Sequence, residues 1–400
     1  MRILFYECKK IFRLPLVIFF LMFTMLMYSM FMRITIHPQD SADCVAQNDL
    51  ARILKEDYGY DTILPYENFG VLEEIRLEQI VYLDKLVQES DVLKINNITT
   101  YEQLDTMDID EMPKEIYEEL IRIDFTDGTR QVFLEQQIDS IYENMKWNPT
   151  MGIEKGKEVE AAEIILSHRT RTQDWTQEAV ERIAHIIEEN RLSLLPNFVL
   201  EHLEDDFLKI AVLLMVSCLI FILPYEIREH LSGGNALFAT TNVGRNLWKK
   251  RYLSAMISWC FLSCIQFVIF CVMLERAEVL QYWKYPVNTV HTFFWFDMNL
   301  GTYLIIKWIF YSLIAFASTT ICYLISRLAQ NYIVGVATAI PTIVLLGLLT
   351  KQFTSRFLVI YTGQENHFWG PICFVVMLLG ISFVIVCSLR CWDKRRDILT

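Results

Sequence analysis

The chain has no sequence that would hold a nucleotide triphosphate, because the pattern G-x-x-x-x-G-K-[ST] occurs nowhere in its 400 residues. It has no C-x-x-C pair, and its seven histidines are scattered along the chain. No Ser/His/Asp or Cys/His grouping stands out either. These absences argue against a built-in ATPase, a structural zinc site and nucleophilic catalysis. We therefore expect no cofactor, no metal and no enzyme activity in this chain.

Charge is missing from several long apolar runs. Leu14–Met32, Tyr252–Leu274 and Leu328–Thr350 contain no Asp, Glu, Lys or Arg. About 20 helical residues cross the hydrocarbon core of a bilayer, so such runs predict transmembrane helices. Six spans are predicted, the second of them closed by Pro224: Leu14–Met32, Phe207–Tyr225, Tyr252–Leu274, Thr302–Ile325, Ile333–Leu349 and Pro371–Leu389.

Basic residues are scarce between positions 34 and 205, where 38 acidic residues face 15 basic ones. Such a segment is unsuited to nucleic acid, which requires clustered Lys and Arg. Cys44 is its only cysteine, so an internal disulfide is excluded. Apolar residues recur there at helical spacing in four runs: Gly70–Ser90, Arg130–Met145, Glu158–His168 and Thr176–Glu189. Around Asp127-Gly128, a helix–turn–helix and a short β-hairpin are both open, and the helices are favoured.

These patterns predict an all-α membrane protein with six transmembrane helices and an inserted, mostly helical extracellular domain. Residues 1–33 would form an interfacial helix and the first span, 34–205 the inserted acidic domain, and 206–400 the remaining spans. For residues 1–13, an amphipathic surface helix is favoured over the alternative, the n-region of a signal peptide.

The distribution of Lys and Arg predicts the orientation. The two ends, the stretch 226–251 and a short link at Arg327 hold 14 basic residues, against four in the two opposite short loops. The positive-inside rule then puts both termini and 226–251 in the cytoplasm, and 34–205 outside the cell membrane. An even number of spans agrees with this.

The stretch 226–251 contains Leu231-Ser232-Gly233-Gly234, the first four residues of the LSGGQ signature of ABC ATPases. Without a phosphate-binding loop, and with cytoplasmic segments too short for an ATPase domain, these four residues do not predict ATP binding. The stretch is better interpreted as a loop that contacts an ATPase.

The whole stretch resembles the cytoplasmic loop between the second and third spans of type-2 ABC exporter permeases, especially Gram-positive ones. The matching residues are Glu226, Ser232-Gly233, Leu237, Thr240-Thr241, Gly244-Arg245 and Lys249–Arg251. The N-terminal sequence from Tyr6 to Arg13 is similar to the interfacial helix of that family, and the six-span plan with an insert after the first span also matches. Asn242-Val243 departs from the pattern, since the family often has a basic residue or proline there.

The resemblance implies a permease subunit in the plasma membrane that pairs with a second copy or a sister permease and with two cytoplasmic ABC ATPase subunits. ATP and Mg²⁺ would bind in those partners. The class exports lipids, peptides, drugs or ions. ATPase coupling is assigned by this resemblance to Glu226, Gly233, Leu237, Thr240, Thr241, Gly244 and Arg245. Arg245 would offer a fixed fork of donors to a carboxylate such as Glu226. The alternative is a solvated basic loop that only sets topology.

A few polar residues interrupt the spans. Lys307 is a candidate for the substrate path, but the favoured interpretation is that its side chain snorkels, so that its ammonium reaches the outer surface. Gln266 is a second substrate-path candidate, and we favour an interhelical hydrogen bond for it and for Thr319-Thr320. The acidic run Glu204–Asp206 at the outer mouth of the second span is interpreted as solvated charge rather than a cation site.

Three functions remain open on the sequence. The favoured one is the permease, with ATPase subunits, a second permease and membrane lipid as partners and no nucleic acid. The second is a receptor whose extracellular domain binds a peptide and signals inward. The third, an integral membrane enzyme, has no polar cluster within the spans to support it.

Overall fold

The structure is a computed structural model that describes residues 2–32, 42–169, 175–232, 247–289, 292–354, 357–360 and 369–399. Each predicted span lies in a helix long and apolar enough to cross a membrane. These helices are α2 (Leu14–Phe31), α11 (Asn197–Leu231), α14 (Leu247–Arg276), α15 (Leu300–Leu328), α16 (Tyr332–Thr354) and α17 (Trp369–Leu399). The predicted all-α membrane fold is thus confirmed.

Helix α11 does not end at Pro224, so that prediction was wrong. It runs through the proline for another seven residues to Leu231. Ser326 of α15 explains how, because its hydroxyl accepts a hydrogen bond from the Glu226 N–H (3.1 Å) and donates one to the Leu223 carbonyl (2.6 Å). A neighbouring helix thereby satisfies backbone groups beside the proline, which is how membrane helices tolerate it.

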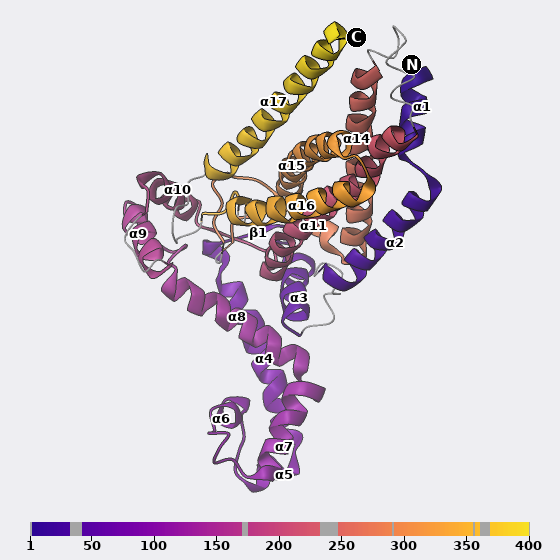
Figure 1. Ribbon diagram of the computed structural model, residues 1–400. Coiled ribbons are helices and arrows are strands. Elements are labelled where there is room, and N and C mark those ends of the chain that lie inside the picture. Colours follow the sequence, from indigo (N-terminus) through magenta and orange to yellow (C-terminus); the bar gives the residue numbers. More distant parts are fainter. Residues whose placement is uncertain are drawn as a thin grey trace.

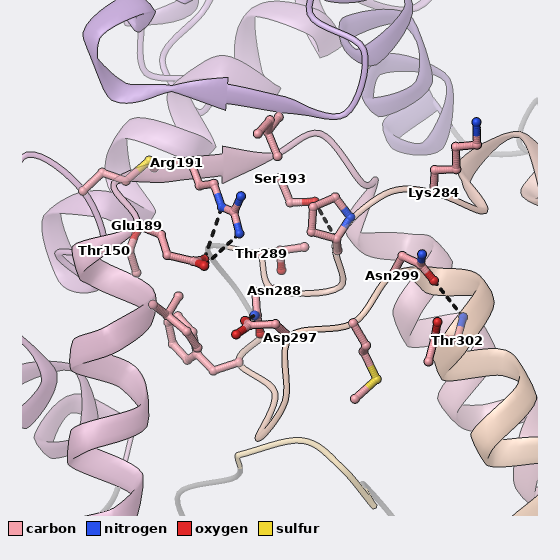
Figure 2. A pocket seen from close by; sticks show the side chains of 16 residues that line it. Thr150, Glu189, Arg191, Ser193, Lys284, Asn288, Thr289, Asp297, Asn299 and Thr302 are labelled. Atoms are coloured by element: carbon pink, nitrogen blue, oxygen red, sulfur yellow. Dashed lines mark hydrogen bonds and ion pairs between the residues drawn. The ribbon is translucent and has the colours of Figure 1, made fainter.

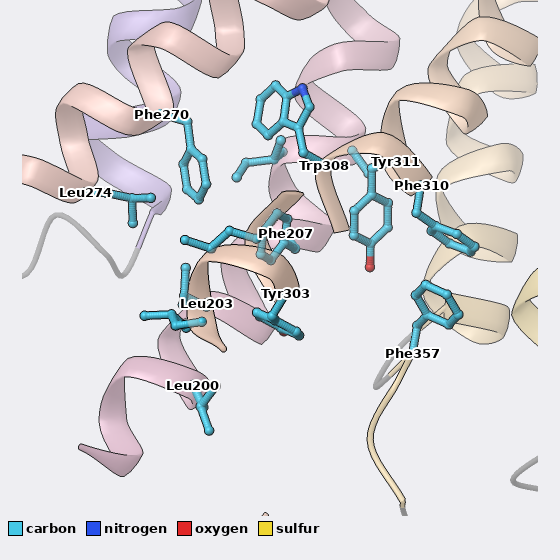
Figure 3. Packing of buried hydrophobic residues seen from close by; sticks show 14 of the residues in the cluster. Leu200, Leu203, Phe207, Phe270, Leu274, Tyr303, Trp308, Phe310, Tyr311 and Phe357 are labelled. Atoms are coloured by element: carbon cyan, nitrogen blue, oxygen red, sulfur yellow. The ribbon is translucent and has the colours of Figure 1, made fainter. Parts of the chain in front are cut away.

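The bundle is built around α11 and α15, which pack along their length. Aromatic rings fill the space between these helices and α14 (Figure 3). Phe207 of α11 packs against Phe270 of α14 and Tyr311 of α15, with ring centroids 5.6 and 5.9 Å apart. In contrast, α2, α14, α16 and α17 expose apolar side chains such as Met25 and Phe383. Such outward apolar faces are typical of helices that contact lipid.

The inserted domain is also mainly helical, as predicted. The four helices predicted there correspond to α4 (Gly70–Glu89), α8 (Thr129–Trp147), α9 (Glu158–Arg169) and α10 (Gln177–Glu188). Its other elements are α3 (Ala42–Glu56), β1 (Ile63–Pro65), η3 (Tyr66–Asn68), α5 (Asp91–Ile95), α6 (Tyr101–Asp105), α7 (Lys114–Arg122), η4 (Ile123–Asp127) and β2 (Arg191–Ser193). Strands β1 and β2 pair antiparallel, with Ile63 opposite Ser193. The turn near Asp127 joins helices rather than strands, so the favoured helix–turn–helix is confirmed.

Helices α4 and α8 form a hairpin that projects away from the bundle and carries α5, α6 and α7 at its far end (Figure 1). This distal tip has a hydrophobic core of its own, contributed by residues between Leu83 and Val132. The base of the hairpin instead joins the main core through residues such as Leu72 and Ile138. The domain is therefore fused to the bundle at its base and separate from it at the tip.

Helix α1 (Arg2–Ile11) precedes the first span and packs against α14 and α11. The N- and C-terminal ends of the chain lie at the same end of the bundle, and the inserted domain lies at the other (Figure 1). This arrangement agrees with an even number of crossings. Which end faces the cytoplasm remains a prediction from the basic residues.

Candidate functional site

Arg251 lies in the first turns of α14, the helix that follows segment 233–246 in the sequence. Its side chain is only 6% exposed. Its Nη1 donates to the Glu226 carboxylate at 3.2 Å and its Nη2 to the Glu229 carboxylate at 3.0 Å. Both glutamates lie in the last turns of α11. The guanidinium therefore joins the two helices that flank segment 233–246.

Helix α1 supplies a second set of charges to the same place. Glu7 accepts a hydrogen bond from the Tyr225 hydroxyl and lies 3.9 Å from Arg251 Nε. Lys10 bridges two carboxylates, with its Nζ 3.2 Å from Glu7 and 3.1 Å from Glu229. The N-terminal helix is thus connected by charge to both α11 and α14.

Helix α15 completes the arrangement. The Tyr323 hydroxyl donates to the second oxygen of Glu226 at 3.0 Å. We call these residues the Arg251 cluster: Glu7, Lys10, Tyr225, Glu226, Glu229, Arg251 and Tyr323. Its members come from four helices that are far apart in the sequence.

The charges of the Arg251 cluster compensate one another in a poorly solvated place. Three carboxylates face the two cations Arg251 and Lys10, and the guanidinium of Arg327 acts on Glu226 from α15. A buried charge that loses its partner is strongly destabilising, which keeps these helix ends together. The cluster lacks a nucleophile–base pair among its described members. Its hydrogen bonds and ion pairs join the ends of four helices at one place.

Among the residues predicted for ATPase coupling, Glu226 is a member of the cluster. The other six, Gly233, Leu237, Thr240, Thr241, Gly244 and Arg245, lie outside the described residues. Glu226 was one candidate partner for Arg245, which lies outside the described residues, and the structure shows Glu226 paired with Arg251. Sequence reasoning missed the roles of Glu7, Tyr225 and Glu229. A signal was available only for Glu229, which follows Glu226 by three residues at a span end, close to a basic run.

Lys307 does not reach the surface, so the favoured snorkelling interpretation was wrong. Its side chain is fully buried, and its Nζ lies 2.9 Å from Glu204 Oε2. Tyr303 donates to the other oxygen of Glu204, and its ring lies 5.4 Å from the ammonium. The Glu204 carboxylate, which is 21% exposed, compensates the ammonium within the protein, so the side chain does not extend to the outer surface. A role for Lys307 in a substrate path stays a prediction.

Asp206 corrects the interpretation of the acidic run as solvated. Its side chain is fully buried and pairs with Lys209 at 2.9 Å, one helical turn away, whereas Asp205 is exposed. Helix α11 begins at Asn197, well before the predicted start of the span, so residues 204–206 lie within a helix. Their side chains therefore point in different directions around the helix axis. Glu204 and Asp206 therefore face inward within a helix.

The interhelical hydrogen bonds predicted in the spans are present for two residues. Gln266 is fully buried, and its Nε2 donates to Thr24 Oγ1 of α2 at 3.0 Å. Thr320 shares a hydrogen bond of 3.2 Å with the Tyr252 hydroxyl of α14. Thr319 instead donates to the Ala315 carbonyl of its own helix. Gln266 as a substrate-path residue stays a prediction.

Comparisons of the chain with protein-family models, with curated proteins and with solved structures found no match.

Proposed function

We propose that this chain is the permease subunit of an ATP-driven ABC exporter of type 2, in which the Arg251 cluster transmits movement of segment 233–246 to the spans. The observation that supports this proposal most is the pair of hydrogen bonds by which Arg251 joins the end of α11 to the start of α14. A force applied to the segment between them would reach α11 and α14 together. Lys10 and Glu7 would carry it on to α1.

In this proposal, segment 233–246 contacts a cytoplasmic ATPase that binds ATP and Mg²⁺, and a second permease copy or a sister permease completes the transporter. The plasma membrane would hold the bundle, with the inserted domain outside the cell. The resemblance of residues 226–251 to the coupling loop of type-2 permeases supports this role. A mostly apolar bundle with buried charge pairs also fits a transport subunit, whose substrate would be a lipid, peptide, drug or ion.

The proposal is tested by purifying the tagged full-length chain from its own membranes and identifying co-purifying ATPases by mass spectrometry. The complex is then reconstituted in liposomes, and ATP hydrolysis is measured. Arg251→Ala should reduce the ATPase activity that depends on the permease by tenfold or more, because the coupling free energy between two such sites is typically about 1–3 kcal/mol. Arg276→Ala, an exposed arginine at the opposite end of α14, is the matched control.

A second pair of changes targets the segment itself. Gly244→Pro with Arg245→Glu should uncouple ATP hydrolysis from transport while the spans stay folded. If no ATPase co-purifies, and this double variant leaves transport and ATPase activity unchanged, the transporter proposal is wrong. A receptor whose outer domain binds a peptide would then be the better description.

A further inference from the structure

A pocket of about 360 Å³ lies where the inserted domain meets the loop between α14 and α15 (Figure 2). Arg251 lies at the start of α14 and this loop follows the other end of that helix, so the pocket and the Arg251 cluster lie at opposite ends of the bundle. One wall comes from the domain and includes Thr150, Glu189 and Arg191. The facing wall comes from the loop and includes Asn288 and Asp297. The volume is at the lower end of the range for small-molecule sites.

A side-chain hydrogen bond holds the two walls together. The Ser193 hydroxyl of β2 donates to the Pro286 carbonyl at 2.6 Å, and within the loop the backbone of Pro286 pairs antiparallel with that of Asn299. On the domain side, the Gly152 N–H donates to the Asn190 side chain at 2.9 Å. Gly152 has a φ of +70°, and an added Cβ would lie 2.6 Å from the Tyr66 ring, so the turn carrying the wall requires glycine.

Thr150 lines the pocket with a hydroxyl that has no partner among the described residues. The residue is 6% exposed, and its Oγ1 is buried without a hydrogen bond. A buried hydroxyl without a partner is costly, so it is usually satisfied by a group that the protein itself does not supply. The hydroxyl of Thr150 therefore points to a ligand in this pocket.

The pocket also has an open cationic group. Arg191 uses Nε and Nη2 for the Glu189 carboxylate, at 3.2 and 2.8 Å. A guanidinium has five N–H donors, so Nη1 remains for a carboxylate of a ligand. The hydrogen bonds to Glu189 hold the Arg191 guanidinium in place.

Two acidic groups lie close to that guanidinium. The Glu189 and Asp297 carboxylates and a ring nitrogen of His185 lie within 4.8 Å of one another. Asp297 accepts from both Nη atoms of Arg182, at 3.1 and 2.6 Å, and from Asn288 at 3.2 Å. Its side chain is still half exposed. A carboxylate offers about four acceptor positions, so an ammonium group can still donate to it.

We propose that this pocket binds a zwitterionic amino acid or short peptide with free termini. Its carboxylate would lie at Arg191 Nη1, its ammonium at Asp297 and Glu189, and one backbone polar group at the Thr150 hydroxyl. The two carboxylates are balanced by Arg182 and Arg191, and Lys284, which also lines the pocket, turns its ammonium away from them (Figure 2). A ligand of zero net charge with separated charges therefore matches the site. An apolar side chain of the ligand would contact Ile186, Phe293 and Met298.

The test is isothermal titration calorimetry on the full-length chain in nanodiscs, without any ATPase, so it stands or fails independently of the permease proposal. The probes are leucine, Leu-Leu and Leu-Leu-Leu, each up to about 10 mM. At least one should bind saturably. The same peptide with an acetylated N-terminus and an amidated C-terminus should bind at least tenfold more weakly. Phosphocholine, whose quaternary ammonium cannot donate hydrogen bonds, should not bind.

Thr150→Val provides the sharpest variant. It should weaken binding of the best probe about five- to tenfold, the loss expected for one hydrogen bond. It should not lower the melting temperature of the ligand-free protein, because the hydroxyl has no protein partner to lose. Thr106→Val in the distal tip is the matched control and should leave binding unchanged.

Arg191→Gln should abolish binding, with Arg122→Gln, an ion-paired arginine of the distal tip, as its control. If Arg191→Gln fails to fold, the proposal is still tested by Thr150→Val and by the blocked peptide, which is the one with an acetylated N-terminus and an amidated C-terminus. The proposal is overturned if none of the three zwitterions binds, if the blocked peptide binds as tightly as the free one, or if Thr150→Val leaves the affinity unchanged.

Discussion

At the scale of single residues, buried ion pairs hold this chain together in places where its composition suggests only apolar contact. Arg251 and Lys307 are both nearly or fully inaccessible, and each lies against a glutamate of α11. Charge pairs between named atoms select one register, because any other leaves a charge without its partner.

Lys307→Met should lower stability by roughly 2–3 kcal/mol, because Glu204 loses its cation while it stays mostly buried. The expected result is a melting temperature several degrees below that of the wild type in detergent. Glu204→Gln in the same chain should restore part of the loss, since no unpaired charge then remains. Lys351→Met, an exposed lysine of α16, serves as the control. An unchanged melting temperature for Lys307→Met would contradict the assignment.

The ion pair between Arg182 and Asp297, which lies outside the membrane-spanning helices, should make the stability of the protein depend on pH. The hydrogen bonds from the Arg182 guanidinium hold the pKa of Asp297 below its ordinary value of 3.8. A lowered folded pKa means that the stabilisation is present above the unfolded value and is lost as the pH falls through the folded one. Arg182→Gln should therefore lower the melting temperature at pH 7, and its difference from the wild type should shrink in strongly acidic solution.

The measurement is the melting temperature of the wild type and of Arg182→Gln at a series of pH values from 7 down to strongly acidic solution. Arg122→Gln, which breaks a more exposed pair, should show a smaller effect at pH 7, since surface pairs contribute little. If the difference in melting temperature between Arg182→Gln and the wild type stays constant down to the lowest pH, the stability does not depend on the ionisation of Asp297.

At the scale of helices and loops, hydrophobic periodicity and length located the elements well. The predicted Gly70–Ser90 and Glu158–His168 differ from α4 and α9 by a single residue at one end. The prediction failed at Pro224, because a local rule about proline was applied where a neighbouring helix decides. Ser326 is a hundred residues away from the backbone N–H that it satisfies, so no local pattern reveals it.

Ser326→Ala should destabilise the bundle by about 1–3 kcal/mol, since it leaves the Glu226 N–H and the Leu223 carbonyl buried and without this partner. It should also increase amide exchange around Pro224, measured by hydrogen–deuterium exchange with mass spectrometry. Ser382→Ala removes a buried hydroxyl that bonds only within α17 and is the matched control. Equal behaviour of the two variants would show that α11 does not depend on Ser326.

At the scale of the whole molecule, the inserted domain divides into a base that shares the main core and a tip with a core of its own. Regions with separate cores open separately, with their own free energies. The pocket with Thr150 lies at the base, and the Arg251 cluster lies at the far end of the spans. Three helices connect the two places: α11, which runs from the domain to the cluster, and α14 and α15, whose connecting loop forms the other wall of the pocket.

Leu104→Ala should unfold the tip without unfolding the bundle. Leu104 is fully buried in the tip core, and truncation of such a leucine costs about 2–5 kcal/mol. Hydrogen exchange should rise across α5, α6 and α7, while α11 and α15 keep their protection. A uniform rise over the whole chain would show instead that the tip and the bundle unfold as one unit.

The sequence by itself determined the fold class, the approximate limits of the spans and the insertion of an acidic helical domain, because charge and hydropathy act over short stretches of chain. It also singled out Glu226. Only the tertiary structure decided the partners of buried charges, the course of α11 past Pro224 and the pocket that contains Thr150. Those features depend on contacts between side chains that are 25 to more than 200 residues apart in the sequence. Local sequence patterns carry no information about such contacts.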